Sequence, residues 1–215
     1  MKFTEIQIEK LIKEVRNSLS PKRFQHTLGV EKMAVILGGK IMPDDVDKLR
    51  VAALLHDISK EYSEAEYFSV VEKHKINLTE EDIAAPALWH SITAPSVVKD
   101  DFPEYADSDV LSAVYNHTVG SPDMTVFDEI ILVSDYIEEG RTYKNCIDVR
   151  ERLLLNLRTA KTYEEFVTAL HEATVSALNN TINDFVSRGK SLHSRTKATH
   201  DAILAKTERQ NNGKS

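Results

Sequence analysis

The sequence predicts an all-α protein, and three observations lead to this fold class. Apolar residues recur at helical spacing through most of the chain, in segments that open with Ser or Thr capping residues. No run alternates apolar and polar residues as a half-buried strand does. The seven glycines form no phosphate-cradling loop, which excludes the Rossmann and P-loop folds. A chain of 215 residues is expected to have one main core.

The first predicted helices are marked by a cap and by apolar stripes. Ser20 before Pro21 is an N-cap followed by proline at the first helical position. The stripe after this cap consists of Phe24, Leu28, Met33, Val35 and Ile36. After the turn at Pro43-Asp44, a second stripe consists of Val46, Leu49, Ala52, Ala53 and Leu55. Both segments are therefore expected to be helices with one buried face.

The later helices are predicted in the same way. Ser63 with Glu66 three residues on is a capping box, and Thr79 caps another short helix. The helical pattern continues in residues 109–117, 126–139 and 163–186. Gly140 and Gly189 follow the last two segments, at the position where a helix end favours a residue that tolerates positive φ.

The composition limits the class of function. A chain with 41% hydrophobic residues and no apolar run of roughly 20 residues is not expected to span a membrane. The N-terminus lacks the apolar stretch of a secretory signal, so the predicted location is cytoplasmic. A formal net charge of -7 disfavours nucleic acid as the main partner and favours small substrates. Because Cys146 is the single cysteine, a metal site would use histidines and carboxylates.

The charge is unevenly spread along the chain. Residues 187–215 hold seven basic residues against Asp201 and Glu208, which leaves about -12 on residues 1–186. This segment also has few large apolar residues. We therefore predict a helical domain over residues 1–186 and a basic tail, flexible or partly helical, over residues 187–215. The tail is the part of the chain that is compatible with RNA or another acidic partner.

Six ionisable side chains stand within or next to apolar helical runs. They are His26, His56, Asp57, His90, His117 and Asp135. A single histidine of this kind is more often a core residue with its own hydrogen-bond partner. Taken by itself, His56-Asp57 with Lys60 is also compatible with an ion pair at the surface. A shared metal ion would satisfy all six side chains together. Nitrogen and oxygen ligands without sulfur suit iron, manganese, cobalt or zinc.

The order of these residues resembles a known family. His26, then His56-Asp57, then Asp135 is similar to the H...HD...D signature of the HD-domain metal-dependent phosphohydrolases, whose fold is an all-α helical bundle. The surrounding blocks resemble, more narrowly, the bacterial YqeK-type symmetrical diadenosine tetraphosphate hydrolases. These blocks are Arg23-Phe24-Gln25-His26-Thr27-Leu28-Gly29-Val30, Leu54-Leu55-His56-Asp57-Ile58-Ser59-Lys60, His117-Thr118-Val119-Gly120 with Met124, and Ser134-Asp135-Tyr136-Ile137-Glu138 with Arg141.

The resemblance implies a metal centre and a reaction. The implied metal ligands are His26, His56, Asp57 and Asp135. The ion would be divalent or trivalent, with iron predicted first and manganese, cobalt or zinc as alternatives. A metal-bound hydroxide would attack diadenosine tetraphosphate symmetrically and release two molecules of ADP.

The resemblance also places cations and histidines around the phosphates. Lys60, His90 and His117 are the predicted catalytic residues. Lys60, with Arg23 and Arg141, would bind the polyphosphate and stabilise charge on the leaving ADP. Two interpretations of His90 and His117 stay open: they bind a second metal ion, or they contact phosphate directly, which we favour.

Further substrate contacts are predicted on two segments. Thr118 and Gly120 follow His117 where a helix ends, so a hydroxyl and a free backbone N–H would meet phosphate or ribose. The predicted nucleoside pocket is lined by polar residues of the last long helix, which are Thr174, Ser176 and Asn179.

Other functions and partners remain open at this stage. Ser121 stands where the family usually has arginine, so nucleotide preference is predicted less closely than reaction class. The alternatives are an HD-type nucleotidase or phosphodiesterase acting on another nucleotide, and a non-catalytic nucleotide-sensing or RNA-associated module. A homodimer is compatible with the sequence.

Overall fold

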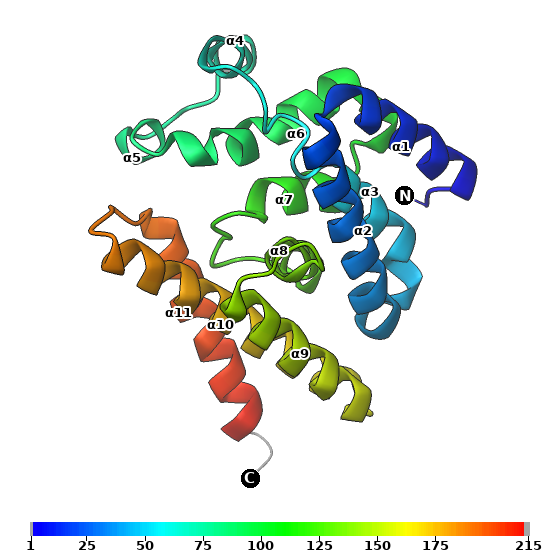
Figure 1. The fold of residues 1–215 in the computed structure, drawn as a ribbon, viewed down its shortest axis with the longest axis vertical. Helices are drawn as coiled ribbons and strands as arrows, with labels where there is room; N and C mark the ends of the chain where they lie inside the picture. Colours follow the sequence, from blue (N-terminus) through cyan, green and yellow to red (C-terminus); the bar gives the residue numbers. More distant parts are fainter. Residues whose placement is uncertain (1, 213–215) are drawn as a thin grey trace.

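The computed structural model describes residues 2–212, and the all-α prediction is confirmed over this range (Figure 1). No β-strand occurs among the described residues. In chain order the elements are α1 (Glu5–Ser18), α2 (Pro21–Ile41), η1 (Pro43–Asp45), α3 (Val46–Leu55), α4 (Glu64–His74), α5 (Glu80–Ile83), η2 (Pro86–Leu88), α6 (Trp89–Asp101), η3 (Pro103–Tyr105), α7 (Ser108–Asn116), α8 (Val126–Ile137), α9 (Lys144–Thr159), α10 (Tyr163–Ser187) and α11 (Ser194–Asn212).

The predicted N-terminal caps form where the sequence places them. The hydroxyl of Ser20 accepts a hydrogen bond from the backbone N–H of Arg23 at 3.3 Å, and Pro21 opens α2. Ser63 and Glu66 form the reciprocal capping box of α4. Local sequence therefore determines where these helices begin.

The two glycines expected at helix ends behave differently. Gly189 has the expected positive φ of 61° after α10. Gly140 does not have a positive φ, and α8 already ends at Ile137. The predicted role of Gly140 as the residue that ends this helix is therefore wrong. A carboxylate oxygen of Glu138 would lie 2.9 Å from a Cβ at position 140, so glycine is needed there for space.

Helix α6 has no counterpart in the sequence prediction. Polar residues interrupt the apolar pattern of this segment, so the sequence gives no clear buried face. In the structure, the polar residues Ser91 and Thr93 are themselves buried. The Ser91 hydroxyl donates to the carbonyl of Leu88 at 2.9 Å, and that of Thr93 donates to the carbonyl of Trp89 at 2.8 Å. Because these hydroxyls bond the local backbone, they can be buried without any distant partner.

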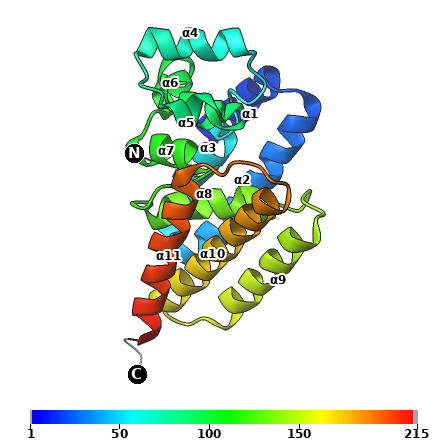
Figure 2. The ribbon, with the colours of Figure 1, turned by 90° about the vertical axis from the view of Figure 1, so that its left-hand side faces the viewer.

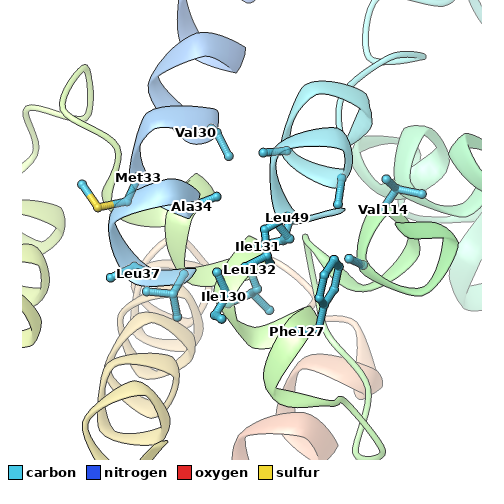
Figure 3. Packing of buried hydrophobic residues seen from close by; sticks show 14 of the residues in the cluster. Val30, Met33, Ala34, Leu37, Leu49, Val114, Phe127, Ile130, Ile131 and Leu132 are labelled. Atoms are coloured by element: carbon cyan, nitrogen blue, oxygen red, sulfur yellow. The ribbon is translucent and has the colours of Figure 1, made fainter. Parts of the chain in front are cut away.

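The core is built around α8, which packs against α2, α7 and α10. Figure 3 shows Val30 of α2, Leu49 of α3, and Phe127 and Ile131 of α8 in one cluster. Three of these four side chains are fully buried, and Phe127 is 3% exposed. Each such side chain stabilises the fold by roughly 1.5–3 kcal/mol. This packing carries the polar end of α8, with Asp135, to the ends of α2 and α3.

The segment predicted as a flexible or partly helical tail contains a packed helix. Helices α9 and α11 flank α10 (Figure 2), and Ile203 of α11 is fully buried. Thr196, Thr199 and Thr207 complete a buried stripe at helical spacing. Threonines and one isoleucine form this stripe. The low number of large apolar residues in the segment therefore did not indicate a packed helix. Helix α11 agrees with the partly helical alternative for this segment and not with the flexible one, and the domain boundary at residue 186 remains a prediction.

Within the described residues, no helix combines the length and the apolar character that crossing a membrane requires.

Candidate active site

The predicted site residues come together from separate helices near the centre of the fold. His26 lies in α2, His90 in α6 and Asp135 in α8, while His56-Asp57 and His117 directly follow α3 and α7. These helices meet near the middle of the molecule in Figure 1. Three overlapping groups of these side chains have ligand atoms within 4.8 Å of one another.

The first half of the cluster contains the four predicted metal ligands. Nε2 of His26 lies 3.0 Å from Oδ1 of Asp135 and 3.7 Å from Oδ2 of Asp57. Nε2 of His56 lies 3.3 Å from the same Asp57 oxygen. The other nitrogen of His56, Nδ1, donates to the carbonyl of Ala53 at 2.7 Å, which turns Nε2 toward the carboxylates.

The polar atoms of this half fit a divalent metal ion. Nε2 of His26 and Nε2 of His56 are buried, and neither has a hydrogen-bond partner among the described residues. Buried ring nitrogens are normally hydrogen-bonded, so two such atoms facing two carboxylates point to a shared ligand. Imidazole with carboxylate oxygen is a donor set for first-row transition metals.

The ionisable groups in the first half of the cluster shift one another's pKa values. Burial alone would raise the pKa of Asp57, but the neighbouring His56 holds that pKa well below its ordinary value. Burial likewise opposes ionisation of Asp135, whereas the neighbouring His26 and the charge of Arg141 lower its pKa. Burial favours neutral His56, but Asp57 outweighs it and raises the pKa of that histidine. Both carboxylates are therefore ionised at neutral pH, as metal binding requires.

The second half of the cluster contains the predicted catalytic residues. Nε2 of His90 lies 3.0 Å from Nε2 of His117 and 3.3 Å from Oδ1 of Asp57. The Lys60 ammonium is 3.1 Å from the same His90 nitrogen, and the Thr118 hydroxyl is 3.3 Å from it. Burial, with His117 and Lys60 nearby, lowers the pKa of His90 well below its usual value. Burial also lowers the pKa of Lys60.

Two arginines neutralise the carboxylates from the solvent side. Nη1 of Arg23 lies 2.8 Å from Oδ2 of Asp57, and Nη2 of Arg141 lies 2.6 Å from Oδ1 of Asp135. Both arginines and His26 border a cavity of about 1000 Å³ between α2 and the loop after α8, which we call the α2 cavity. The cluster therefore opens onto a cation-bearing cavity large enough for a nucleotide.

Comparison with known protein families gives the same assignment as the cluster. The family model of the HD domain matches residues 23–152, a span that contains all six residues of the cluster. The chain belongs to the HD domain family. Its all-helical architecture is that of the family.

This HD domain is similar to bacterial proteins over most of its length. It is 30% identical over 197 residues to the symmetrical bis(5'-nucleosyl)-tetraphosphatase of Halalkalibacterium halodurans, covering 91% of this chain and 96% of the relative. The enzyme of that name from Bacillus subtilis is 27% identical, with 89% of this chain and 94% of the relative covered. The crystal structure of a predicted HD superfamily hydrolase involved in NAD metabolism from Clostridium acetobutylicum superimposes with a TM-score of 0.79 and 28% identity, covering 96% of this chain and 100% of that one.

Within the HD domain, the structure places the two predicted contacts after His117 differently. The Thr118 hydroxyl lies 3.3 Å from Nε2 of His90, and its contact with substrate stays a prediction. The backbone N–H of Gly120 donates to the carbonyl of Asn116 at 2.9 Å, so the expectation that it is free is wrong. Gly120 has φ of 68°, and its place is set by the turn that follows α7.

The three predicted nucleoside contacts on α10 are not brought to the cluster. Thr174 is fully buried, and its hydroxyl donates to Glu129 at 2.9 Å, which leaves it inaccessible to substrate and corrects that prediction. Ser176 borders a groove against α9, and Asn179 is exposed. Neither of these two borders the α2 cavity among the described residues. Asn180, one helical turn after Ser176, borders the groove against α9 and also lies near Asp135.

Sequence reasoning missed the role of Glu138. One of its oxygens lies 3.2 Å from Nδ1 of His26, and the other accepts the N–H of Gly140 at 2.6 Å. The side chain fits because position 29 has no Cβ: one placed there would lie 2.4 Å from Oε2 of Glu138. Glu138 therefore orients the His26 ring so that Nε2 faces the cluster. The signal in the sequence was a carboxylate three residues after Asp135, where a helix could bring both to one side.

Gly29→Ala is expected to weaken metal binding about 10- to 100-fold, because the added methyl displaces Glu138 from His26. The matched control is Gly39→Ala in the same helix, where a Cβ meets nothing within 4 Å. Alanine is the better helix former, so the control should raise stability by about 0.5–1 kcal/mol and leave metal affinity unchanged. Calorimetric titration of each protein with Mn²⁺ measures the difference. Equal affinities in the two variants would show that Glu138 does not orient His26.

Proposed function

We propose that this HD domain is a symmetrical bis(5'-nucleosyl)-tetraphosphatase, which hydrolyses diadenosine tetraphosphate into two molecules of ADP. The observation that carries the proposal is the complete histidine and aspartate cluster of an HD domain with three cations, Lys60, Arg23 and Arg141, around it. The names of the most similar curated relatives support the same reaction.

The first half of the cluster would hold the metal ion, through His26, His56, Asp57 and Asp135. When bound there, the ion supplies a Lewis acid that polarises a phosphoryl oxygen and lowers the pKa of a coordinated water. Iron is the proposed ion, and manganese, cobalt and zinc are the alternatives that the same ligand set accommodates.

The second half of the cluster would bind phosphate. Lys60 places an ammonium beside His90, which disfavours a second metal ion at His90 and His117 because two cations would repel each other. A neutral His90 and the Thr118 hydroxyl can donate hydrogen bonds to a phosphate oxygen instead. Arg23 and Arg141 would complete the charge compensation on the polyphosphate.

The reaction is one hydrolysis. The oxygen of a water molecule forms a bond to the second phosphorus of one half, and the bond from that phosphorus to the bridging oxygen breaks. The bridging oxygen leaves with the third phosphorus as the terminal oxygen of the other ADP. Lys60 and the arginines stabilise the charge that develops on this leaving group, because they are positioned before the reaction.

Product analysis tests the proposal. Incubation of the metal-loaded protein with diadenosine tetraphosphate in oxygen-18 water should give ADP as the sole nucleotide product, with the label in one of the two ADP molecules. Mass spectrometry after ion-exchange separation measures both. Formation of AMP and ATP, or phosphate release from mononucleotides while the dinucleotide stays intact, would contradict the proposed reaction.

The other sequence-based interpretations gain no specific support. No structural feature of the described residues favours a different nucleotide or a non-catalytic module over the tetraphosphatase. A cytoplasmic location, a homodimer, and nucleic-acid binding through the basic C-terminal segment stay predictions.

A further inference from the structure

A second cavity, next to the α2 cavity, reaches the metal cluster at Asp135. It has a volume of about 380 Å³ and lies between the end of α8, the start of α9 and the last turns of α10. We call it the α10 cavity. Its lining includes Asp135, Tyr136, Asn180 and Asp184. Both cavities are bordered by Arg141 and Tyr143, so these two residues form the divide between them.

The two cavities differ in charge. The α2 cavity is lined by Lys22, Arg23 and Lys32 in addition to the shared arginine, and by Glu61, Glu138 and Glu139, which leaves one cation in excess. In the α10 cavity, two arginines face two carboxylates. Arg188 lies 2.8 Å from Asp184, and Arg141 lies 2.6 Å from Asp135. The α2 cavity therefore suits phosphates, whereas the α10 cavity suits an uncharged group.

The α10 cavity has the mixed lining that a nucleoside needs. Tyr136 contributes an aromatic ring whose hydroxyl lies beside Asn180. The Asn180 amide and the Asp184 carboxylate offer donors and acceptors for a base edge or a ribose. At the divide, Tyr143 is 74% exposed, which leaves its ring available for stacking on a base. Cavities of about 300–1,000 Å³ are typical of small-ligand sites.

We propose that the enzyme holds both halves of the dinucleotide at once, with the second nucleoside in the α10 cavity and the polyphosphate running past Arg141 into the α2 cavity. This inference rests on the proposed function. Its consequence is that the metal cluster, which borders the α2 cavity through His26 and the α10 cavity through Asp135, faces the middle of the polyphosphate. Symmetrical cleavage then follows from seating two nucleosides on either side of one centre.

The inference is tested by removing the second nucleoside and by filling its cavity. Adenosine 5'-tetraphosphate has the same polyphosphate but one nucleoside, and cleavage at the same bond gives ADP and pyrophosphate. In the native enzyme its kcat/KM should be about 10-fold below that of the dinucleotide, because it lacks the second binding contribution. Thr181 borders the α10 cavity, so Thr181→Trp should lower kcat/KM for the dinucleotide about 10-fold. The value for adenosine 5'-tetraphosphate should change less than about two-fold.

The matched control is Val186→Trp on the same helix, where the side chain is 70% exposed and no cavity is filled. Val186→Trp should leave kcat/KM unchanged for both the dinucleotide and adenosine 5'-tetraphosphate. Asn180→Ala is a second, smaller change that should lower kcat/KM for the dinucleotide and not for adenosine 5'-tetraphosphate. It tests the inference if Thr181→Trp does not fold. Equal losses for both substrates, or no loss for either, would overturn the inference.

Binding of a non-hydrolysable dinucleotide separates this inference from the proposed reaction. Diadenosine tetraphosphate with a methylene bridge between the second and third phosphates should bind Thr181→Trp about 10-fold more weakly than the native protein by calorimetry. If the native protein binds this analogue about 10-fold more tightly than Thr181→Trp does but forms no ADP from the natural dinucleotide, the proposed function fails and the two-cavity binding mode stands. If ADP is formed but the analogue binds both proteins equally, the inference fails alone.

Discussion

Asp57→Asn is expected to lower turnover of diadenosine tetraphosphate by at least about 1,000-fold and to remove the bound metal ion. Asp57 joins both halves of the cluster, because one oxygen lies near His56 and Arg23 and the other lies 3.3 Å from His90. An amide offers no negative charge to the ion or to Arg23. Metal analysis by plasma mass spectrometry should find about one ion per native chain and much less in the variant.

Asp100→Asn is the matched control for this experiment. Asp100 also faces a histidine, with one oxygen 2.7 Å from Nε2 of His74, and it pairs with Lys73 at 2.8 Å. This pair lies at the surface, where such ion pairs contribute little to stability. Metal content and turnover should therefore stay within two-fold of the native values, on the order of experimental error. An Asp57→Asn protein that keeps its metal and its activity would remove Asp57 from the mechanism.

Lys60→Met is expected to lower kcat/KM by about 100-fold while the metal content holds, because the partly buried ammonium lies beside His90. Among the described residues it forms no ion pair with a proposed metal ligand. Methionine keeps the length and apolar character of the side chain, so packing changes little. Lys73→Met, at a side chain that is 64% exposed, is the control and should have no effect. Loss of metal from Lys60→Met would show instead that the residue supports the metal centre.

The pH dependence of the same residue gives a second measurement. Burial lowers the pKa of Lys60, so the charged form is lost at lower pH than for an ordinary lysine. Since the charged form binds phosphate, kcat/KM should fall as pH rises through this lowered pKa. Lys60→Arg keeps the charge at all accessible pH values and should move the fall to higher pH. An alkaline limb that is identical in both proteins would assign it to another group.

Much of the helical framework could be predicted from local sequence. Ser20-Pro21 and the capping box at Ser63 begin helices because their partners lie within three residues. Helix α11 could not be predicted in this way. Its buried face has threonines in place of large apolar residues, and that face is buried because α10 covers it.

The candidate site was predictable in part for the same reason. Histidines and aspartates next to apolar runs must be buried with partners, and this indicated His26, His56-Asp57 and Asp135 before any contact was known. Thr174 follows the same logic, but its partner is Glu129 in another helix. The sequence pattern around a threonine is the same whether its hydroxyl faces substrate or a buried carboxylate, so the sequence does not distinguish the two.

The sequence by itself determined the all-α class, the helix starts with local caps, and the set of side chains able to share a metal ion. Tertiary structure alone decided which atoms of that set meet. Glu138 reaches His26 across 112 positions of the chain because Gly29 leaves space for it. Arg141 borders two cavities because its loop lies beside residues of α2 in one and beside residues of α10 in the other. Spacing along one helix fixes which residues share a face, but contacts between helices depend on how whole faces pack.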